Sequence, residues 1–183
     1  MPTENSIRAA LCCLGIILSF SAAGCAQENL RSMRATSNAM APLIPMNADF
    51  LVRDARATDV PAQGDVVVFK QPPKNAEWTV KRVVAVEGDE IEIVQKVLRI
   101  NGKVADEPYA IHTDRRVMPA DESLPPQVRF RDNVPQTKIG RGQVYVLGDN
   151  RDASVDSRFF GPISTSAISG YVVEPKATTS ERP

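Results

Sequence analysis

The feature that most constrains this chain is a series of short apolar runs, rich in Val and Ile, that are separated by turn-forming residues. Runs of this length bounded by Gly, Pro, Asn or Asp are typical of β-strands, whereas a helix needs apolar residues that repeat about every 3.6 positions over a longer stretch. The chain has no long stretch with that helical period, and most of its 10 glycines and 14 prolines fall between the runs. The pattern predicts an all-β fold with little helix, built as a partly open β-barrel or coiled sheets of about ten strands.

Individual strands can be predicted from the runs. The strongest turn signal is Asn101-Gly102, because a two-residue hairpin of type I′ needs positive φ at both central positions. Gly64-Asp65 and Gly88-Asp89 mark two further turns. The strand candidates are DFLVRDA (49–55), QGDVVVFKQP (63–72), EWTVKRVVAVEGDEIEIV (77–94, a strand, a turn and a strand), VLRINGKV (97–104), GQVYVLGDN (142–150) and AISGYVVEP (167–175).

The remaining segments complete the predicted organisation. Residues 1–25 form a leader, and residues 26–36 a polar tether or a first strand, ahead of one domain at 37–175. Within that domain, residues from about 111 to 137 are charged and rich in proline, which predicts an irregular insertion with a short strand at QVRFRD (127–132). The tail at 176–183 is predicted to be disordered.

The leader places the domain in the cell envelope. Residues 9–26 carry no charge, a length at the lower limit for spanning a bilayer. Ala22-Ala23-Gly24-Cys25 resembles a bacterial lipoprotein cleavage box, which would make Cys25 the lipidated first residue of the mature chain; an uncleaved signal anchor is the alternative. Both alternatives predict a membrane-anchored protein whose main domain lies outside the cytoplasm.

Composition excludes several classes of function. The 22 basic and 22 acidic residues balance and are scattered, so a nucleic acid partner has no support. The chain has one histidine, His112, and all three cysteines lie in the leader. A zinc site and a triad with a histidine base are therefore not expected, and no metal or other cofactor is predicted. His112 is expected on a surface loop.

Two segments can carry chemistry. Lys81 lies in a strand pattern that places Thr79 and Val83 on the same face, and a lysine becomes a useful base when burial lowers its pKa. From the strand pattern alone, an exposed lysine is the simpler interpretation. The second segment, GDNRDASVDSR (148–158), concentrates acids, bases and hydroxyls into eleven residues, a composition that suits a solvated loop or a hydrogen-bonded cluster orienting a buried side chain.

Four segments in this order resemble the bacterial type I signal peptidases, serine peptidases that cut leader peptides from exported proteins. The matching segments are SNAMAPLI (37–44), GDVVVFKQP (64–72), KRVVAVEGDEI (81–91) and GDNRDASVDSRFFG (148–161). INGK and EPY, within 100–109, are also similar to the family. The resemblance implies a β fold with a Ser-Lys dyad, in which serine attacks the scissile carbonyl and a neutral lysine takes its proton.

The resemblance also assigns roles residue by residue. Lys81 matches the general base, Ser154 the serine that orients it, and Ser37 the oxyanion-hole hydroxyl. Asp156 and Arg158 match a supporting ion pair, with Asp149 and Arg151 in the same shell, and Met40 and Pro42 match the substrate cleft.

The nucleophile position holds Ala39, which has no nucleophilic atom. Loss of a nucleophile from a coupled site costs about 10⁶ in kcat. Three explanations are open: an engineered or erroneous change in a working peptidase, a natural inactive relative that binds peptides, or a takeover by Ser37. The takeover is disfavoured because the next same-side residue on a strand lies about 6–7 Å away. Two lesser departures are Leu43, where threonine is usual, and Glu87, where proline is usual.

Two functions are therefore predicted. The first is a signal-peptidase-like serine endopeptidase acting on leader peptides at the membrane surface, inactive or strongly impaired because of Ala39. The alternative is a pseudopeptidase that holds extended export-signal peptides by strand addition without cleaving them. A self-cleaving repressor with a Ser-Lys dyad is disfavoured, since no helix-turn-helix is present and the leader indicates export.

Overall fold

The computed structural model describes residues 29–70 and 77–175. The predicted leader with Cys25 and the tail at 176–183 lie outside the described residues. No helix within 29–70 or 77–175 is both long and apolar enough to cross a membrane.

The described residues form eleven strands and a few short helical turns, which are joined by loops. The strands are β1 (Leu30–Arg34), β2 (Asp49–Asp54), β3 (Val66–Lys70), β4 (Trp78–Ala85), β5 (Glu90–Val94), β6 (Val97–Ile100), β7 (Lys103–Val104), β8 (Val134–Lys138), β9 (Gln143–Leu147), β10 (Ile163–Ser164) and β11 (Ile168–Pro175). The helical turns are α1 (Pro126–Arg129), η1 (Arg151–Ala153), α2 (Ser157–Phe160) and η2 (Thr165–Ala167). The predicted all-β fold is confirmed.

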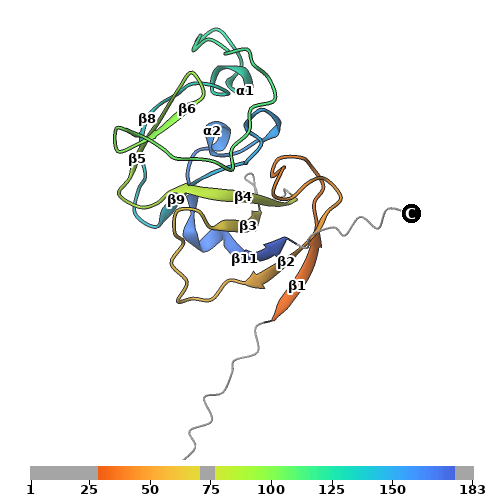
Figure 1. Cartoon of the computed structure of the whole chain (residues 1–183). Coiled ribbons are helices and arrows are strands. Elements are labelled where there is room, and N and C mark those ends of the chain that lie inside the picture. The colour runs from red at the N-terminus through yellow and green to blue at the C-terminus, as the bar shows by residue number, and fades with distance from the viewer. Residues whose placement is uncertain (1–28, 71–76, 176–183) are drawn as a thin grey trace, which may run out of the picture.

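The strands form two open sheets rather than a closed barrel. The larger sheet has seven strands in the order β1-β2-β11-β3-β4-β9-β10, and the smaller has four in the order β7-β6-β5-β8. All the strand pairs are antiparallel. Figure 1 shows the smaller sheet beside α1 at one end of the molecule and β1, β2, β3 and β11 at the other.

β4 connects the two sheets. It pairs with β3 and β9 in the larger sheet and runs through the turn at Gly88 and Asp89 into β5 of the smaller one. Buried apolar residues from β4 and β9 pack against the smaller sheet, and others from the same strands pack within the larger sheet. A third group of buried apolar residues lies between β2, β3 and the segment that follows β1. β4 is thus held by packing on both sides.

The insertion departs from the prediction in one respect. The short strand expected at 127–132 is wrong: Pro126–Arg129 forms a helical turn, and the strand of this region is β8. A proline suits the first position of a helical turn because its missing N–H needs no partner there. β8 also contains Pro135, which is compatible with its place at the edge of the smaller sheet.

Candidate active site

Three separate segments meet at the candidate site. The first is the turn after β1, which carries Ser37 and Ala39; the second is β4, with Lys81; the third is the loop of residues 148–158 after β9. The backbone N–H of Asn150 donates to the carbonyl of Ala39 at 3.0 Å, which joins the first and third segments directly. Ser37, Ala39 and Lys81 line one cleft with a volume of about 300 Å³.

The apolar wall of this cleft comes from the core of the larger sheet. Its lining includes Met33, Met40, Ile44, Phe50 and Val80. The open side carries Arg34, Glu77 and Trp78, which are exposed. A groove with an apolar floor, bordered by strand edges, suits an extended peptide chain better than a small charged ligand.

Lys81 is a buried lysine, with only 3% of its surface exposed. Its Nζ donates to Thr79 Oγ1 at 2.9 Å and to the carbonyl of Val80 at 3.0 Å. Burial lowers the pKa of Lys81 to about 8, although the Asp156 carboxylate acts in the opposite direction and the Arg158 guanidinium acts with burial. A large fraction of the side chain is therefore neutral at mildly alkaline pH, as a general base requires.

The nucleophile position is part of the cleft wall. Ala39 is buried, and its N–H donates to Ser37 Oγ at 3.4 Å. Ser37 is exposed and its hydroxyl keeps its own O–H donor, so it can face a ligand in the cleft. Met40 is buried and lines the cleft. Pro42, expected in the cleft, instead lies exposed on the turn that follows, joined to Ala41 by a cis peptide bond.

The Asp156 and Arg158 side chains form a bidentate ion pair inside the protein. Nε and one terminal nitrogen of Arg158 each donate to Asp156 at 2.9 Å, and the two side chains are 0% and 2% exposed. Arg158 also donates to the backbone carbonyls of Arg131, Arg151 and Ser154. Burial alone would raise the pKa of Asp156, but the adjacent guanidinium holds it below the usual value.

Two further ion pairs hold the same loop, and sequence reasoning missed one partner in each. Asp149 accepts two hydrogen bonds from Arg82 of β4, at 2.8 and 2.7 Å. Arg151 pairs with Glu107 and donates to the carbonyl of Gly148. Arg82 and Glu107 lie 67 and 44 positions from their partners, so no local pattern could reveal the pairs.

Ser154 is not a hydrogen-bond partner of Lys81. Its hydroxyl is buried and forms no hydrogen bond with Lys81, whose Nζ bonds Thr79 and Val80 instead; Ser154 also contributes to the lowered pKa of Asp156. It packs over Gly148 so closely that a Cβ at position 148 would lie 2.3 Å from Ser154 Oγ and 2.6 Å from the carbonyl oxygen of Ala39. The orienting contact that the family resemblance implied for Ser154 is therefore not formed in this structure.

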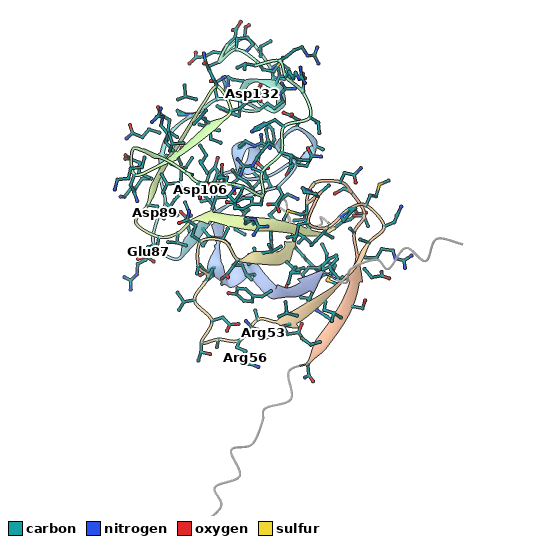
Figure 2. All side chains as sticks on the ribbon, viewed as in Figure 1. Arg53, Arg56, Glu87, Asp89, Asp106 and Asp132 are labelled. Carbon is teal, nitrogen blue, oxygen red and sulfur yellow. The ribbon has the colours of Figure 1, made fainter. Side chains whose placement is uncertain are left out.

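A second charged cluster anchors the insertion rather than forming a site. Lys96 Nζ bonds Asp152 at 3.0 Å and lies 3.8 Å from Asp132. Asp132 lies at the end of the molecule that carries the smaller sheet and α1 (Figure 2). His112 is exposed, as expected, with Nδ1 4.0 Å from Asp152. No group of His, Cys, Asp and Glu within the described ranges could hold a metal ion.

The two departures from the family pattern have structural roles. Leu43 packs against the apolar cluster of β2, β3 and the Met40 turn. Glu87 accepts a hydrogen bond from the N–H of Gly142 at 2.8 Å. Neither side chain is among the residues that line the cleft.

Comparison with known proteins places the chain among the signal peptidases. The family model for signal peptidase, peptidase S26, matches residues 6–175. The chain is 36% identical over 108 residues to a signal peptidase I of Bacillus caldolyticus, covering 59% of this chain and 57% of that protein. It is 40% identical over 112 residues to a signal peptidase IB of Staphylococcus aureus, covering 60% and 58%.

Among solved structures, a signal peptidase I from Enterococcus faecalis V583 aligns with a TM-score of 0.46 and 25% identity, over 62% of this chain and 97% of that one. The chain spans less than two thirds of the length of the curated relatives named above. With the family match extending over nearly the whole sequence, the chain belongs to the signal peptidase family, peptidase S26.

Proposed function

We propose that this chain holds extended export-signal peptides in the cleft between the Ser37–Met40 segment and β4, and that it does not cleave them efficiently. The observation that carries the proposal is the combination of a buried Lys81 and an alanine in one cleft. Lys81 is the candidate base, Ser37 the candidate oxyanion hydroxyl and the buried ion pairs their candidate support, but Ala39 offers no atom that could bond to a carbonyl carbon.

The setting of this function follows from the leader. We propose that residues 1–25 anchor the domain to the membrane, by lipidation of Cys25 or as an uncleaved anchor, with the domain outside the cytoplasm. In that position the domain would meet export-signal peptides outside the cytoplasm. The apolar wall around Met40 and Phe50 suits their small or apolar side chains.

The chemistry that Ala39 prevents can be stated step by step. A serine at position 39 would bond through Oγ to the scissile carbonyl carbon while its proton passes to neutral Lys81. The resulting oxyanion would be held by Ser37 and a backbone N–H. The Lys81 ammonium would then protonate the leaving amine, and water would hydrolyse the remaining ester.

A paired assay tests the proposal. The parent chain and Ala39→Ser are incubated with a preprotein whose cleavage site carries small residues, and product is followed by mass spectrometry, while binding of the corresponding signal peptide is measured by fluorescence anisotropy. We expect both chains to bind the peptide and only Ala39→Ser to yield product, with Ala39→Gly as a matched control that restores no oxygen. Failure of both chains to bind would refute the proposal, and cleavage by the parent chain at a rate comparable to Ala39→Ser would refute its inactivity.

A second candidate is an active peptidase in which Ser37 attacks instead. The exposure of Ser37 in the cleft favours it, but its hydroxyl is bonded to the Ala39 N–H rather than to Lys81. Ser37→Ala in the parent chain distinguishes this candidate, because it would abolish any residual cleavage that Ser37 performs.

A further inference from the structure

The hydrogen bond between Lys81 and Thr79 is a contact that neither the family resemblance nor the proposed function explains. Thr79 precedes Lys81 by two positions on β4, so the two side chains project from the same face of the strand. The Nζ–Oγ1 distance is 2.9 Å, and Thr79 and Lys81 line the same cleft. Ser154 Oγ is not among the hydrogen-bond partners of Lys81.

The geometry of an amine explains why this contact matters. A neutral lysine Nζ has two N–H donors and one lone pair, arranged tetrahedrally. In this structure Thr79 Oγ1 and the Val80 carbonyl accept two hydrogen bonds from Nζ. The Val80 carbonyl belongs to the backbone, which leaves Thr79 as the one side chain in this arrangement that can set the rotation of Nζ. With both donors engaged, the lone pair is the remaining tetrahedral position on Nζ, and Thr79 helps to fix its direction.

We propose that Thr79 is the positioning residue for Lys81 in this chain, and that it performs the orienting task that the family resemblance implied for Ser154. The inference deepens the proposed function, because it names the group that would hold the base for a nucleophile at position 39. A merely structural role would be different: Thr79 would stabilise β4 without influencing how Lys81 binds its proton.

The surroundings of Lys81 allow the two roles to be separated. The charged groups around its ammonium are Asp156 and Arg158 of the loop after β9. Arg34 and Glu77, which line the cleft, are exposed. None of these four changes when Thr79 is replaced. A hydroxyl that accepts from Nζ favours the ammonium over the amine, so its removal should lower the pKa of Lys81 further.

The experiment measures the titration of Lys81 in the full chain. Lysine side chains are labelled with ¹³C, and the signal of the carbon bonded to Nζ is followed by NMR from pH 6 to 11 and assigned with Lys81→Met. We expect Thr79→Val, which keeps the shape and removes the hydroxyl, to lower the pKa of Lys81 by about one unit. Thr79→Ser should stay close to the parent value, and so should Ser154→Ala.

Two results would overturn the inference: an unchanged titration of Lys81 in Thr79→Val, or a shift in Ser154→Ala as large as that in Thr79→Val. Thermal unfolding of each variant establishes that it is folded, and Thr79→Ala is the second variant if Thr79→Val does not fold.

A catalytic readout is added in the Ala39→Ser background. There Thr79→Val should lower kcat by about tenfold to a hundredfold with little change in KM, because misorientation of the base impairs the chemical step rather than binding. Thr79→Ser should recover most of the rate. A fall in KM and kcat that Thr79→Ser does not recover would refute a positioning role. If Ala39→Ser cleaves nothing, the proposed function fails at its own test, while the titration of Lys81 still decides the role of Thr79.

Discussion

Replacing Arg158 with leucine should destabilise the domain more than any other single replacement of a charged side chain in the loop of residues 148–158. The change removes the cation that faces Asp156 and also the donor to three backbone carbonyls. Asp156 would retain hydrogen bonds from neutral donors, among them the backbone N–H groups of Gly148 and of position 158, but would lose its cation. A carboxylate that is 0% exposed would then stay buried without a counter-ion.

The magnitude follows from that burial. Removing one partner of a buried ion pair costs about 3–5 kcal/mol, mainly because the remaining charge is no longer compensated. For a chain of this size, each kcal/mol lowers the melting temperature by about 2–4 °C, so a fall of about 6–20 °C is expected. An exposed pair provides the control: Arg34→Leu removes a side chain that is 66% exposed and should leave the melting temperature nearly unchanged.

The assay is urea unfolding of the parent chain, Arg158→Leu, Asp156→Asn and the double variant. The double variant should lose less stability than Arg158→Leu alone, because it buries no unpaired charge. The pH dependence has a definite sign. In the parent chain the pKa of Asp156 is below its usual value, so the stabilisation is present above the unfolded pKa and is lost as the pH falls through the folded pKa. In Arg158→Leu the loss of stability should shrink toward about pH 4, where the carboxylate accepts a proton. A loss below about 1 kcal/mol, or a double variant less stable than Arg158→Leu, would refute the reasoning.

Three further predictions concern Lys81 and Gly148. Folded Lys81 releases its proton near pH 8 and the unfolded side chain near 10.5, so the unfolded chain binds more protons between these pH values. The free energy of unfolding should therefore rise with pH across that window, and the rise should be missing when Lys81→Met is unfolded in urea. In the Ala39→Ser background, kcat should likewise increase as the pH passes about 8 and level off above it, and a profile that is flat from pH 6 to 10 would contradict the assignment of Lys81 as base. Gly148→Ala should lower the free energy of unfolding by about 1–3 kcal/mol and weaken peptide binding, because its Cβ would lie 2.6 Å from the Ala39 carbonyl oxygen. Gly140→Ala is the comparison, since there the new Cβ would contact the movable end of the Gln143 side chain. Equal losses of stability in the two variants would count against the crowding argument.

Much of the secondary structure could be predicted from the sequence because it depends on local signals. The runs at 66–70, 90–94 and 143–147 are strands, and Asn101-Gly102 turns between β6 and β7 with positive φ at both positions. The prediction failed at 127–132, where Pro126 begins a helical turn that the alternation of QVRFRD does not reveal. Strand order was beyond prediction, since β11 inserts between β2 and β3 and many antiparallel orders suit the same strands.

What the sequence by itself determined is the chemical inventory of the cleft: an alanine at position 39, a lysine at 81, and acids, bases and hydroxyls at 148–158. What only the tertiary structure decided is which of these groups touch. Lys81 bonds to Thr79 rather than to Ser154, and Arg82 reaches Asp149 across 67 positions. Composition and local pattern specify which side chains are available. Their partners depend on the pairing of β4 with β9 and on the path of the loop beyond β9, because a hydrogen bond is made or lost within less than an ångström.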